Sequence, residues 1–498
     1  MPIRSQDLLA AAPLSAKAGT AHGAGMTLPL NRRNLHRLSA GIAAPGHDPA
    51  RVRAGIVHLG LGGFHRAHMA RYTDALMARD TGALGWGITG AGLMPGDRAL
   101  LAALAGQDGL YTLVERDGVS ERAAVIGSLA GVIDASDSPA VLLDAIADPA
   151  TRIVSLTVTE HGYCLDRATR RLDPAHPLIA HDLANPRAPR SAIGVLVEAF
   201  GRRRGGRAFT ALSCDNIPHN GAVLRAAVLD FAARIDPGLA EWIAKHARFP
   251  STMVDRITPV PRPEDAAYIA ATYGIADGAP VMCEGFSQWV IEDDFADGRP
   301  DWDRVGAQFV RDVAPYETMK LRLLNASHLA VAGLGALMGM TSIDETMRDP
   351  GLRAYMAALM EQETGPTVPP VPGIDLAAYR AGLIERFANP AIRDTVERVN
   401  TDAPVNYLLD PIRDRLAGDQ PIPLLALALA AWLRRVREPG FRHPLAAELR
   451  AAAIAGGVDP RPLLSIEALF GAPGKDERLI AAVGAWLRLL QNASPIPK

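Results

Sequence analysis

The sequence predicts an α/β protein in which a Rossmann-like, doubly wound sheet domain is followed by a mainly α-helical C-terminal domain. Apolar strands alternate with helical patterns in the amino-terminal part of the chain, a glycine-rich turn follows the first strand, and after about residue 305 the patterns are helical. Strands that alternate with helices favour a parallel sheet. Because single cores stop growing near about 250–300 residues, a chain of 498 residues is expected to form two or more domains.

The elements of the first part are expected around that turn. Residues 55–80 are predicted to form a short apolar strand, a glycine turn and an amphipathic helix. Further strands are expected within residues 84–93, 152–160 and 208–214. In the second part, helical periodicity marks residues 305–338, 352–363, 376–388 and 423–438.

These patterns define the expected limits of the domains. Residues 1–25 are small and polar and lack a strong signal-peptide core, so we expect either a disordered extension or a start-site artefact ahead of Met26. Residues 26–304 are expected to form the Rossmann-like domain, and residues 305–498 the helical domain. Ligands of a parallel sheet bind outside the carboxyl ends of its strands.

The composition gives no sign of a nucleic-acid, metal or membrane partner. The chain is 48% hydrophobic and 21% charged with a net charge of −2, which gives no sign of nucleic-acid binding. Cys164, Cys214 and Cys283 are scattered, so neither a disulfide framework nor a cysteine-rich metal site is expected, and a reducing cytoplasm fits. No apolar run has the length of a membrane span. No long heptad pattern argues against a monomer.

The glycine turn VHLGLGGFHRAH matches part of a dinucleotide-binding fingerprint. Gly60 and Gly62 take its first two positions, where the chain must turn tightly and the backbone must approach a pyrophosphate. Gly63 and Phe64 continue into the helix, whereas the third glycine is replaced by a histidine. Arg66 adds a cation where phosphate is expected. A generic strand-to-helix turn is the alternative, because an imperfect fingerprint is weak by itself.

A carboxylate that grips the adenosine ribose is expected after the second strand. Asp97 is the best-placed candidate, and a loop or capping role is the alternative. A carboxylate accepts a hydrogen bond from a free 2′-hydroxyl and repels a 2′-phosphate. NAD is therefore preferred over NADP as the cofactor.

The segment KLRLLNASH places polar groups in an otherwise apolar helical run. At about 100° per residue, Lys320, Asn325 and His328 share one side of a helix, and Glu317 joins them. A solvated stripe on an amphipathic helix has the same spacing. Spacing alone leaves both interpretations open.

Six segments together resemble the mannitol dehydrogenase family of long-chain polyol and sugar-acid dehydrogenases. They are GIVHLGLGGFHRAH, SLTVTEHGY, SCDNIPHNG, STMVDRITP, QWVIEDDF and PYETMKLRLLNASH, and the resemblance extends from about Leu28 to the carboxyl end. It implies a Rossmann-like domain, a helical domain with substrate and catalytic groups, and an active site in the cleft between them. It also implies metal-free hydride transfer between a polyol or ketose and NAD.

The resemblance assigns catalytic roles. Lys320 is the expected general base, Asn216 and Asn325 the groups that stabilise the oxyanion, and His328 the group that orients the substrate. Lysine normally titrates near about 10.4 and needs desolvation or neighbouring cations to act as a base near neutrality. Taken singly, each residue also has an ordinary structural interpretation.

Proton relay and substrate binding complete the expected site. Glu317, one helical turn before Lys320, is expected to relay its proton to solvent. Glu160 matches a family position on the proton path, and Asp255 and Arg398 match positions that bind substrate hydroxyls in polyol-specific members. Asn406 stands where many relatives have a lysine, so the end of the substrate is expected to be held differently.

The leading expected activity is the interconversion of D-mannitol and D-fructose with NAD. Reduction of fructuronate to D-mannonate and oxidation of D-arabinitol are the alternatives within the family, because the guanidinium of Arg398 could instead pair with a substrate carboxylate. A sensor that binds a dinucleotide without turnover is the alternative from another class.

Overall fold

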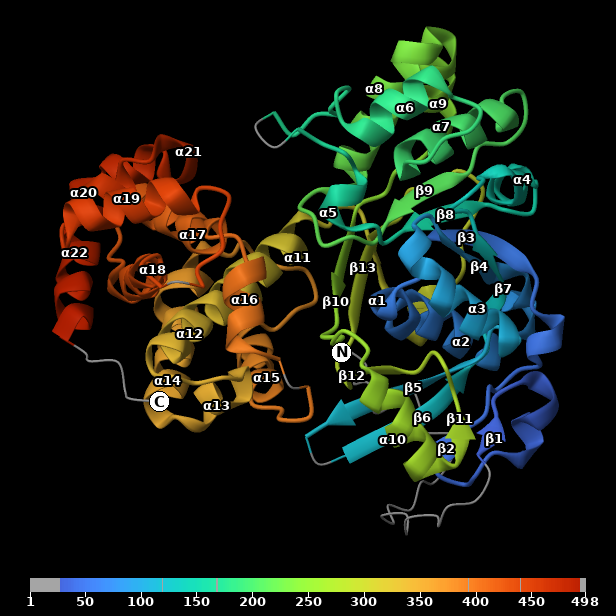
Figure 1. Ribbon diagram of the computed structural model, residues 1–498, viewed down its shortest axis with the longest axis horizontal. Helices are drawn as coiled ribbons and strands as arrows, with labels where there is room; N and C mark the ends of the chain where they lie inside the picture. The colour runs from blue at the N-terminus through green and yellow to red at the C-terminus, as the bar shows by residue number, and fades with distance from the viewer. Residues whose placement is uncertain (1–26, 119, 167–168, 393, 439, 493–498) are drawn as a thin grey trace. The chain divides into compact units, whose positions relative to one another are not determined.

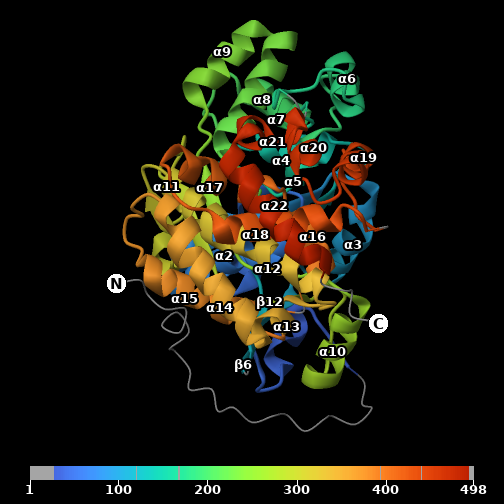
Figure 2. The same ribbon diagram turned by 90° about the vertical axis from the view of Figure 1, so that its left-hand side faces the viewer.

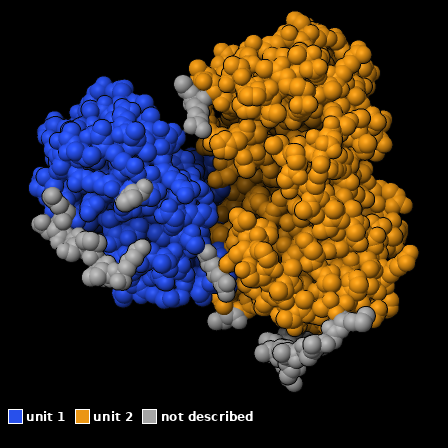
Figure 3. Space-filling model, viewed as in Figure 1, with its two compact units in different colours: residues 1–2, 314–498 blue, residues 3–313 orange. Residues whose placement is uncertain are grey.

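The computed structural model describes residues 27–492, apart from residues 119, 167–168, 393 and 439. The chain divides into two compact units (Figure 3). We call Ile3–Val313 the sheet unit, and Ala314–Lys498 with Met1–Pro2 the helical unit. The extension expected over residues 1–25 lies outside the described residues.

The sheet unit is built on five parallel strands in the order β7-β4-β3-β8-β9 (Figure 1). They are β3 (Ala54–Leu59), β4 (Gly87–Gly92), β7 (Leu129–Asp134), β8 (Ile153–Leu156) and β9 (Thr210–Ser213). In chain order this is 3-2-1-4-5, the doubly wound arrangement whose ligands bind where the order reverses, beside β3. The predicted Rossmann-like sheet is confirmed. The strand expected over residues 152–160 is shorter, because the chain turns after Leu156 into the short helix α5 (Thr159–Gly162).

Both faces of this sheet are covered by helices, since alternate residues of β3 pack in different cores. Ile56 belongs to one core and Val57 and Leu59 to the other. The first face is covered by α1 (Gly63–Ala67), α2 (Met69–Arg79) and α3 (Arg98–Gly106). The second is covered by α4 (Ala140–Ala147), α6 (Pro177–Ala184), α7 (Ala192–Arg203), α8 (Asn220–Ile235) and α9 (Pro237–His246). Burial on both faces explains why the strands are apolar throughout.

Smaller sheets complete the sheet unit. A four-stranded sheet has the order β12 (Val281–Glu284), β5 (Tyr111–Asp117), β6 (Ser120–Ile126) and β2 (Ile42–Ala43). A three-stranded sheet has the order β10 (Thr252–Asp255), β13 (Gln288–Glu292) and β14 (Gln308–Val310). A two-stranded sheet pairs β1 (Leu28–Pro29) with β11 (Ile275–Ala276), which α10 (Pro263–Tyr273) precedes. The 3₁₀-helical segments are η2 (Arg32–Arg37), η3 (Pro49–Arg51), η4 (Thr81–Trp86), η5 (Pro95–Asp97) and η6 (Trp302–Val305).

The helical unit contains helices throughout its described residues. They are α11 (Ala314–Met319), α12 (Ala326–Leu337), α13 (Ile343–Arg348), α14 (Pro350–Ala358), α15 (Leu376–Phe387), α16 (Val396–Asp402), α17 (Asn406–Ala417), α18 (Pro423–Arg435), α19 (Ala446–Gly456), α20 (Arg461–Leu464), α21 (Glu467–Phe470) and α22 (Glu477–Asn492). Two π-helical segments, η7 (Lys320–Asn325) and η8 (Leu359–Thr364), and the 3₁₀ turns η9 (Gly365–Thr367) and η10 (Ala472–Lys475) interrupt the series. The predicted helical character is confirmed.

Helix α18 is the centre of the helical unit. It lies between α12 and α22 (Figures 1 and 2), and its leucine and alanine side chains are buried almost all around. Small alanine side chains let neighbouring helices approach closely. No helix of the described residues is long and apolar enough to cross a membrane.

The prediction of helix from residue 305 onward needs a correction. Residues 308–310 form β14, which pairs with β13 and so belongs to the sheet unit. Backbone pairing with an existing strand overrides the local helical pattern. The helical part begins at Ala314.

Candidate active site

The glycine turn closes β3 onto helix α1 in the way that its sequence requires. Gly60 adopts φ +89°, and a Cβ atom there would lie 2.3 Å from the carbonyl oxygen of Thr157. Gly62 is the residue immediately before α1, and Gly63 and Phe64 begin that helix. The Phe64 ring stacks on His68 with ring centroids 4.9 Å apart. Only glycine fits at position 60. The turn follows the first strand of the main sheet, at the switch point where the strand order reverses.

The predicted role of Arg66 does not fit its place in the structure. Its side chain is 2% exposed, and its guanidinium donates to the carbonyl oxygen of Ala279 and, from Nε over 3.3 Å, to that of Gly62. The guanidinium also lies over the Tyr111 ring, 5.4 Å from its centroid. These contacts face the interior of the sheet unit, because α1 packs on β12 on the side that carries Arg66. Arg66 supports the turn from within and does not present a cation to a phosphate.

Two buried histidines beside the turn were missed by the sequence analysis. His58 bonds through Nδ1 to the Ser155 hydroxyl over 2.8 Å and through Nε2 to the Thr157 hydroxyl over 2.9 Å. Its ring stacks on His65, the residue that replaces the third glycine, with centroids 3.4 Å apart. Burial lowers the pKa of His58 to about 3 and that of His65 well below its usual range, so both are neutral. A histidine within the apolar strand IVHL was the available signal.

The carboxylate expected at the ribose caps a turn in the structure. Asp97 accepts the Met94 backbone N–H through Oδ2 over 3.0 Å, just after β4 ends. The neighbouring Arg98 lies 3.2 Å from Asp134 and also pairs with Asp137. The capping interpretation of Asp97 is therefore correct for one oxygen, while its ribose role stays a prediction. The cation beside it is neutralised by two carboxylates.

The SCDN segment follows β9 and places Asn216 in an exposed position. Asp215 before it is 6% exposed and accepts the backbone N–H groups of Thr159, over 2.7 Å, and Val158, over 3.3 Å. Burial raises the pKa of Asp215 to about 6, although these hydrogen bonds favour its charged form. Asn216 was predicted from the sequence, whereas its buried neighbour Asp215 was not.

Glu160, which the sequence analysis placed on a proton path, lies on the short helix α5. Its carboxylate is well exposed and accepts a hydrogen bond from Arg170 over 2.7 Å. An exposed ion pair of this kind contributes little to stability. The relay role of Glu160 stays a prediction.

The MVDRITP segment joins a candidate residue to a buried ion pair. Asp255, the last residue of β10, is 4% exposed. The next residue, Arg256, is also buried and donates from Nη2 to Glu115 over 2.5 Å. Burial alone would raise the pKa of Glu115, but Arg71 and Arg256 outweigh it and lower that pKa to about 2. Much of this motif therefore holds the smaller sheets together.

The predicted catalytic helix is not a regular α-helix. Residues 320–325 form the π-helical segment η7, in which the Ala326 N–H donates to the Leu321 carbonyl, five residues back. The expected rotation of 100° per residue is therefore wrong across this segment. A π turn stacks residues five apart, which brings Asn325 closer to the side of Lys320 than an α-helix would. Glu317, Lys320 and Asn325 are each only 8% exposed, so a solvated stripe is excluded.

His328 and Arg398 meet on a carboxylate that the sequence analysis did not identify. Asp394 accepts two hydrogen bonds from Arg398, from Nε over 2.7 Å and from Nη2 over 2.6 Å. His328 Nε2 lies 3.3 Å from Asp394 Oδ2, and its ring packs on Phe387 with centroids 4.4 Å apart. Burial alone would raise the pKa of Asp394, but His328 and Arg398 hold it below its usual range. The available signal was the spacing of four residues between Asp394 and Arg398 in the sequence.

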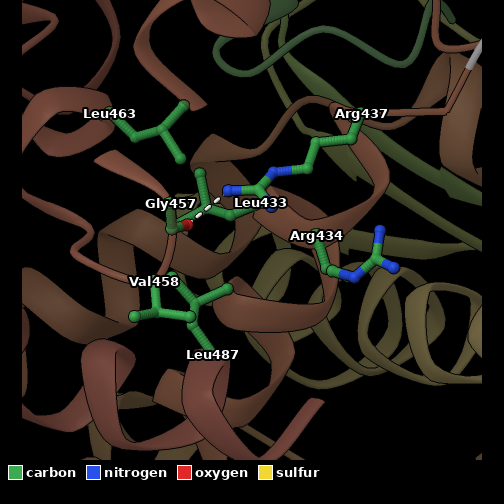
Figure 4. Close-up of a pocket in the computed structure, with 7 residues that line it drawn as sticks. All are labelled: Leu433, Arg434, Arg437, Gly457, Val458, Leu463 and Leu487. Atoms are coloured by element: carbon green, nitrogen blue, oxygen red, sulfur yellow. Dashed lines mark hydrogen bonds between the residues drawn. The ribbon is translucent and has the colours of Figure 1, made fainter. Parts of the chain in front are cut away.

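The remaining candidate and the visible pocket lie elsewhere in the helical unit. Asn406 is exposed at the start of α17. A pocket seen in Figure 4 is lined by Leu433, Arg434, Arg437, Gly457, Val458, Leu463 and Leu487, and none of the predicted site residues lines it. Among the described residues, no group of three or more His, Cys, Asp or Glu side chains is arranged to hold a metal ion.

Comparison with known proteins defines the class. The model of the mannitol dehydrogenase Rossmann domain matches residues 54–304, and that of the mannitol dehydrogenase C-terminal domain matches residues 312–490. D-mannonate oxidoreductase of Escherichia coli K12 is 48% identical over 400 residues, which cover 79% of this chain and 82% of that protein. Mannitol 2-dehydrogenase of Aspergillus fumigatus is 41% identical over 479 residues, covering 92% and 95%.

Solved structures agree with these matches. The Pseudomonas fluorescens mannitol 2-dehydrogenase, in a ternary complex with NAD and D-mannitol, has a TM-score of 0.83 and 42% identity, covering 93% of this chain and 97% of that one. A substrate-free D-sorbitol dehydrogenase has a TM-score of 0.84 and 33% identity, covering 94% and 100%.

A Rossmann-type sheet with a glycine turn, joined in one chain to a helical unit, is typical of dinucleotide-dependent dehydrogenases. More narrowly, the chain belongs to the mannitol dehydrogenase family of oxidoreductases.

Proposed function

We propose that the chain is a mannitol 2-dehydrogenase, which interconverts D-mannitol and D-fructose with NAD. The observation that supports this most is the cluster on α11 and η7, where Glu317, Lys320 and Asn325 are almost buried on an irregular helix. Burying a lysine is costly, so a nearly buried amine with polar neighbours favours a chemical role. The similarity to mannitol 2-dehydrogenases over nearly the whole chain points to the same reaction.

The residues around the glycine turn fit a dinucleotide. Gly60 and Gly62 leave the backbone without side chains at the start of α1, and partial positive charge at a helix amino end suits a pyrophosphate. When bound, NAD accepts the hydride from the substrate carbon.

The chain's own residues handle the proton. Lys320, as the neutral amine, takes the proton of the C2 hydroxyl while the carbon–hydrogen bond breaks. Asn216 and Asn325 donate hydrogen bonds to the oxygen as its negative charge develops. Glu317, one turn before Lys320, passes the proton on, and Glu160 is the second candidate for this relay. In the reverse direction the ammonium of Lys320 protonates the forming alkoxide.

A neutral polyol fits the surroundings of Arg398 better than a sugar acid does. The Nε and Nη2 groups of Arg398 are both bonded to Asp394, so this edge is not open to a substrate carboxylate. The charge of Asp394 also offsets that of the guanidinium. Asp255, His328, Arg398 and Asn406 then bind hydroxyl groups of the substrate.

NAD is proposed in preference to NADP. A 2′-phosphate needs a cation, and Arg98, the cation next to Asp97, is paired with Asp134 and Asp137. Asp97 keeps one carboxylate oxygen beyond the Met94 contact for a ribose hydroxyl.

One specific observation favours a second function, D-mannonate oxidoreductase. The E. coli enzyme of that name is 48% identical over 400 residues, and Asn406 stands where many relatives have a lysine. Oxidation of D-mannitol, D-arabinitol and D-mannonate with NAD and with NADP, followed by absorbance of the reduced cofactor, separates the two. We expect the highest kcat/KM for D-mannitol with NAD, unchanged by EDTA. A higher value for D-mannonate contradicts the first proposal, and NAD binding without turnover on any polyol or sugar acid supports a sensor.

A further inference from the structure

Two loops that carry candidate residues start side by side at the carboxyl edge of the main sheet. Strands β8 and β9 pair in parallel, with Leu156 opposite Ser213. The loop after β8 leads to Glu160, and the loop after β9 leads to Asn216. A contact that joins these two loops therefore restrains the distance between Glu160 and Asn216.

The side chain that ties them is Asp215. It is 6% exposed, and its Oδ1 accepts the Thr159 N–H over 2.7 Å. Its Oδ2 accepts the Val158 N–H over 3.3 Å and the Tyr163 hydroxyl over 2.9 Å. Tyr163 in turn lies 2.5 Å from the Ser213 hydroxyl, back on β9. One carboxylate thus accepts from three groups of the β8 loop.

The backbone that Asp215 holds is strained. Thr159 has φ +62°, in the left-handed region that a β-branched residue rarely adopts. Such a conformation persists only when the surroundings support it, and strained residues cluster at functional sites. The hydrogen bond from the Thr159 N–H to Asp215 supplies that support directly before Glu160.

The same loop also touches the glycine turn. The Thr157 hydroxyl donates to the Gly60 carbonyl over 2.7 Å, and the Thr157 carbonyl oxygen occupies the space where a Cβ of Gly60 would be. His58 bonds to the Thr157 hydroxyl as well. The loops after β3, β8 and β9 are therefore joined by one network in which Asp215 anchors the last two.

We infer that Asp215 is a positioning residue: by holding Thr159 in the left-handed conformation it fixes Glu160 and Asn216 on adjacent loops for the dehydrogenation. This inference rests on the proposed function. Because the carboxylate of Asp215 is buried and three donors already engage it, we assign it to holding the backbone and not to acid or base catalysis.

The decisive experiment combines Asp215→Asn with Thr159→Gly. Asp215→Asn turns an acceptor oxygen into an NH₂ group that faces N–H donors, so kcat is expected to fall about 100-fold, as small misplacements of reacting groups do. Glycine adopts positive φ without support, so in the double variant Asp215→Asn/Thr159→Gly we expect kcat to recover to within about tenfold of the wild type. No recovery in a folded double variant overturns the inference.

Asp182→Asn is the matched control. Asp182 is fully buried and, like Asp215, accepts two backbone N–H groups, from Arg190 and Ser191, and one hydroxyl. Replacing the Asp182 carboxylate disrupts similar hydrogen bonds but leaves the bond from the Thr159 N–H to Asp215 in place. We expect this variant to unfold at a lower temperature while the kcat of the folded protein stays near the wild-type value. If kcat falls equally in Asp182→Asn, a general loss of stability explains the effect of both variants, and the inference is overturned.

Hydrogen exchange separates this inference from the proposed function. Exchange at the amides of residues 157–163 is expected to quicken in Asp215→Asn and to be unchanged in Asp182→Asn, whatever the substrate is. Faster exchange with wild-type kcat overturns the positioning role and leaves the proposed function intact. A wild type without turnover on any polyol overturns the proposed function alone. Where Asp215→Asn does not fold, Tyr163→Phe takes its place, and faster exchange with a several-fold lower kcat is expected.

Discussion

The two π-helical segments of the helical unit, η7 and η8, share one backbone geometry but differ in the role of their side chains. In η7 the Ala326 N–H donates to the Leu321 carbonyl, and in η8 the Gly365 N–H donates to the Met360 carbonyl, five residues back in both cases. Each interrupts an apolar helical run. π-Helical turns are rare and occur often at functional sites, so both are candidates until their side chains are compared.

The side chains of η8 are used by the fold itself. Glu363 is 2% exposed and accepts the backbone N–H groups of Leu424, over 2.8 Å, and Leu425, over 2.7 Å. These groups lie in the first turn of α18, where backbone donors have no partner within the helix. The π turn of η8 thus places the Glu363 carboxylate at the amino end of α18.

The side chains of η7 differ in exposure and in chemistry. Lys320 and Asn325 each keep 8% of their surface, and a lysine and an amide can exchange protons and hydrogen bonds with a small molecule. An irregular helix therefore does not by itself mark a functional site. What its polar groups bind decides whether the irregularity serves folding or chemistry.

The strongest test of this contrast is Lys320→Ala. Loss of a general base is expected to lower kcat by about 10³–10⁴-fold, with little change in the dissociation constant of NAD. Arg322→Ala is the matched control, because Arg322 lies in the same π turn and pairs with Asp414 over 2.7 Å. Steady-state kinetics and NAD titration measure both. Near-normal turnover in Lys320→Ala would remove the lysine from the base role.

Glu363→Ala tests the other π turn. Removing the carboxylate leaves two N–H groups of α18 without partners, so the free energy of unfolding is expected to fall by about 2–4 kcal/mol. Because Glu363 has no part in the proposed chemistry, kcat/KM of the folded variant is expected to stay near the wild-type value. Denaturant unfolding and kinetics on the same preparation measure the two quantities. A selective loss of kcat at unchanged stability would contradict the assigned role of η8.

The fold was predictable because its signals are local. Apolar strands alternating with helices define the doubly wound sheet, and Gly60 sits where only glycine fits. The extent of β14 was not predictable, since it is set by pairing with β13 (Gln288–Glu292), which lies outside the local helical pattern. A short apolar run is compatible with helix or strand until a partner is known.

The candidate site was predictable in part for a similar reason. Exposed or reactive residue types such as Lys320 and Asn216 stand out in a motif, whereas the direction of a side chain does not. Arg66 turned inward because a carbonyl and an aromatic ring accept it there. Asp215 and Asp394 were missed, because a buried carboxylate is recognised by the groups that converge on it.

A smaller effect is expected from Asp394→Asn, which separates substrate binding from the chemistry of η7. Asparagine cannot accept both hydrogen bonds from Arg398 and no longer attracts His328, so both side chains lose their orientation. The KM for the polyol is expected to rise about tenfold, equivalent to about 1.4 kcal/mol, while kcat changes less. Asp402→Asn is the control, because Asp402 contacts the same arginine at 3.6 Å from an exposed position. A loss confined to kcat would place Asp394 with Lys320 in the chemistry.

The smallest effect is expected from Arg437→Ala, the counterpart of Glu363 at the opposite end of a helix. Arg437 Nη2 donates to the carbonyl oxygens of Ala453, over 2.7 Å, and Gly457, where α19 ends (Figure 4). A cation at a helix carboxyl end is worth about 0.3–1 kcal/mol when exposed to solvent, so a small decrease in unfolding free energy is expected without change in kcat/KM. Because Arg437 also lines the pocket, a clear change in KM for the polyol would show that this pocket, and not the surroundings of η7, binds the substrate.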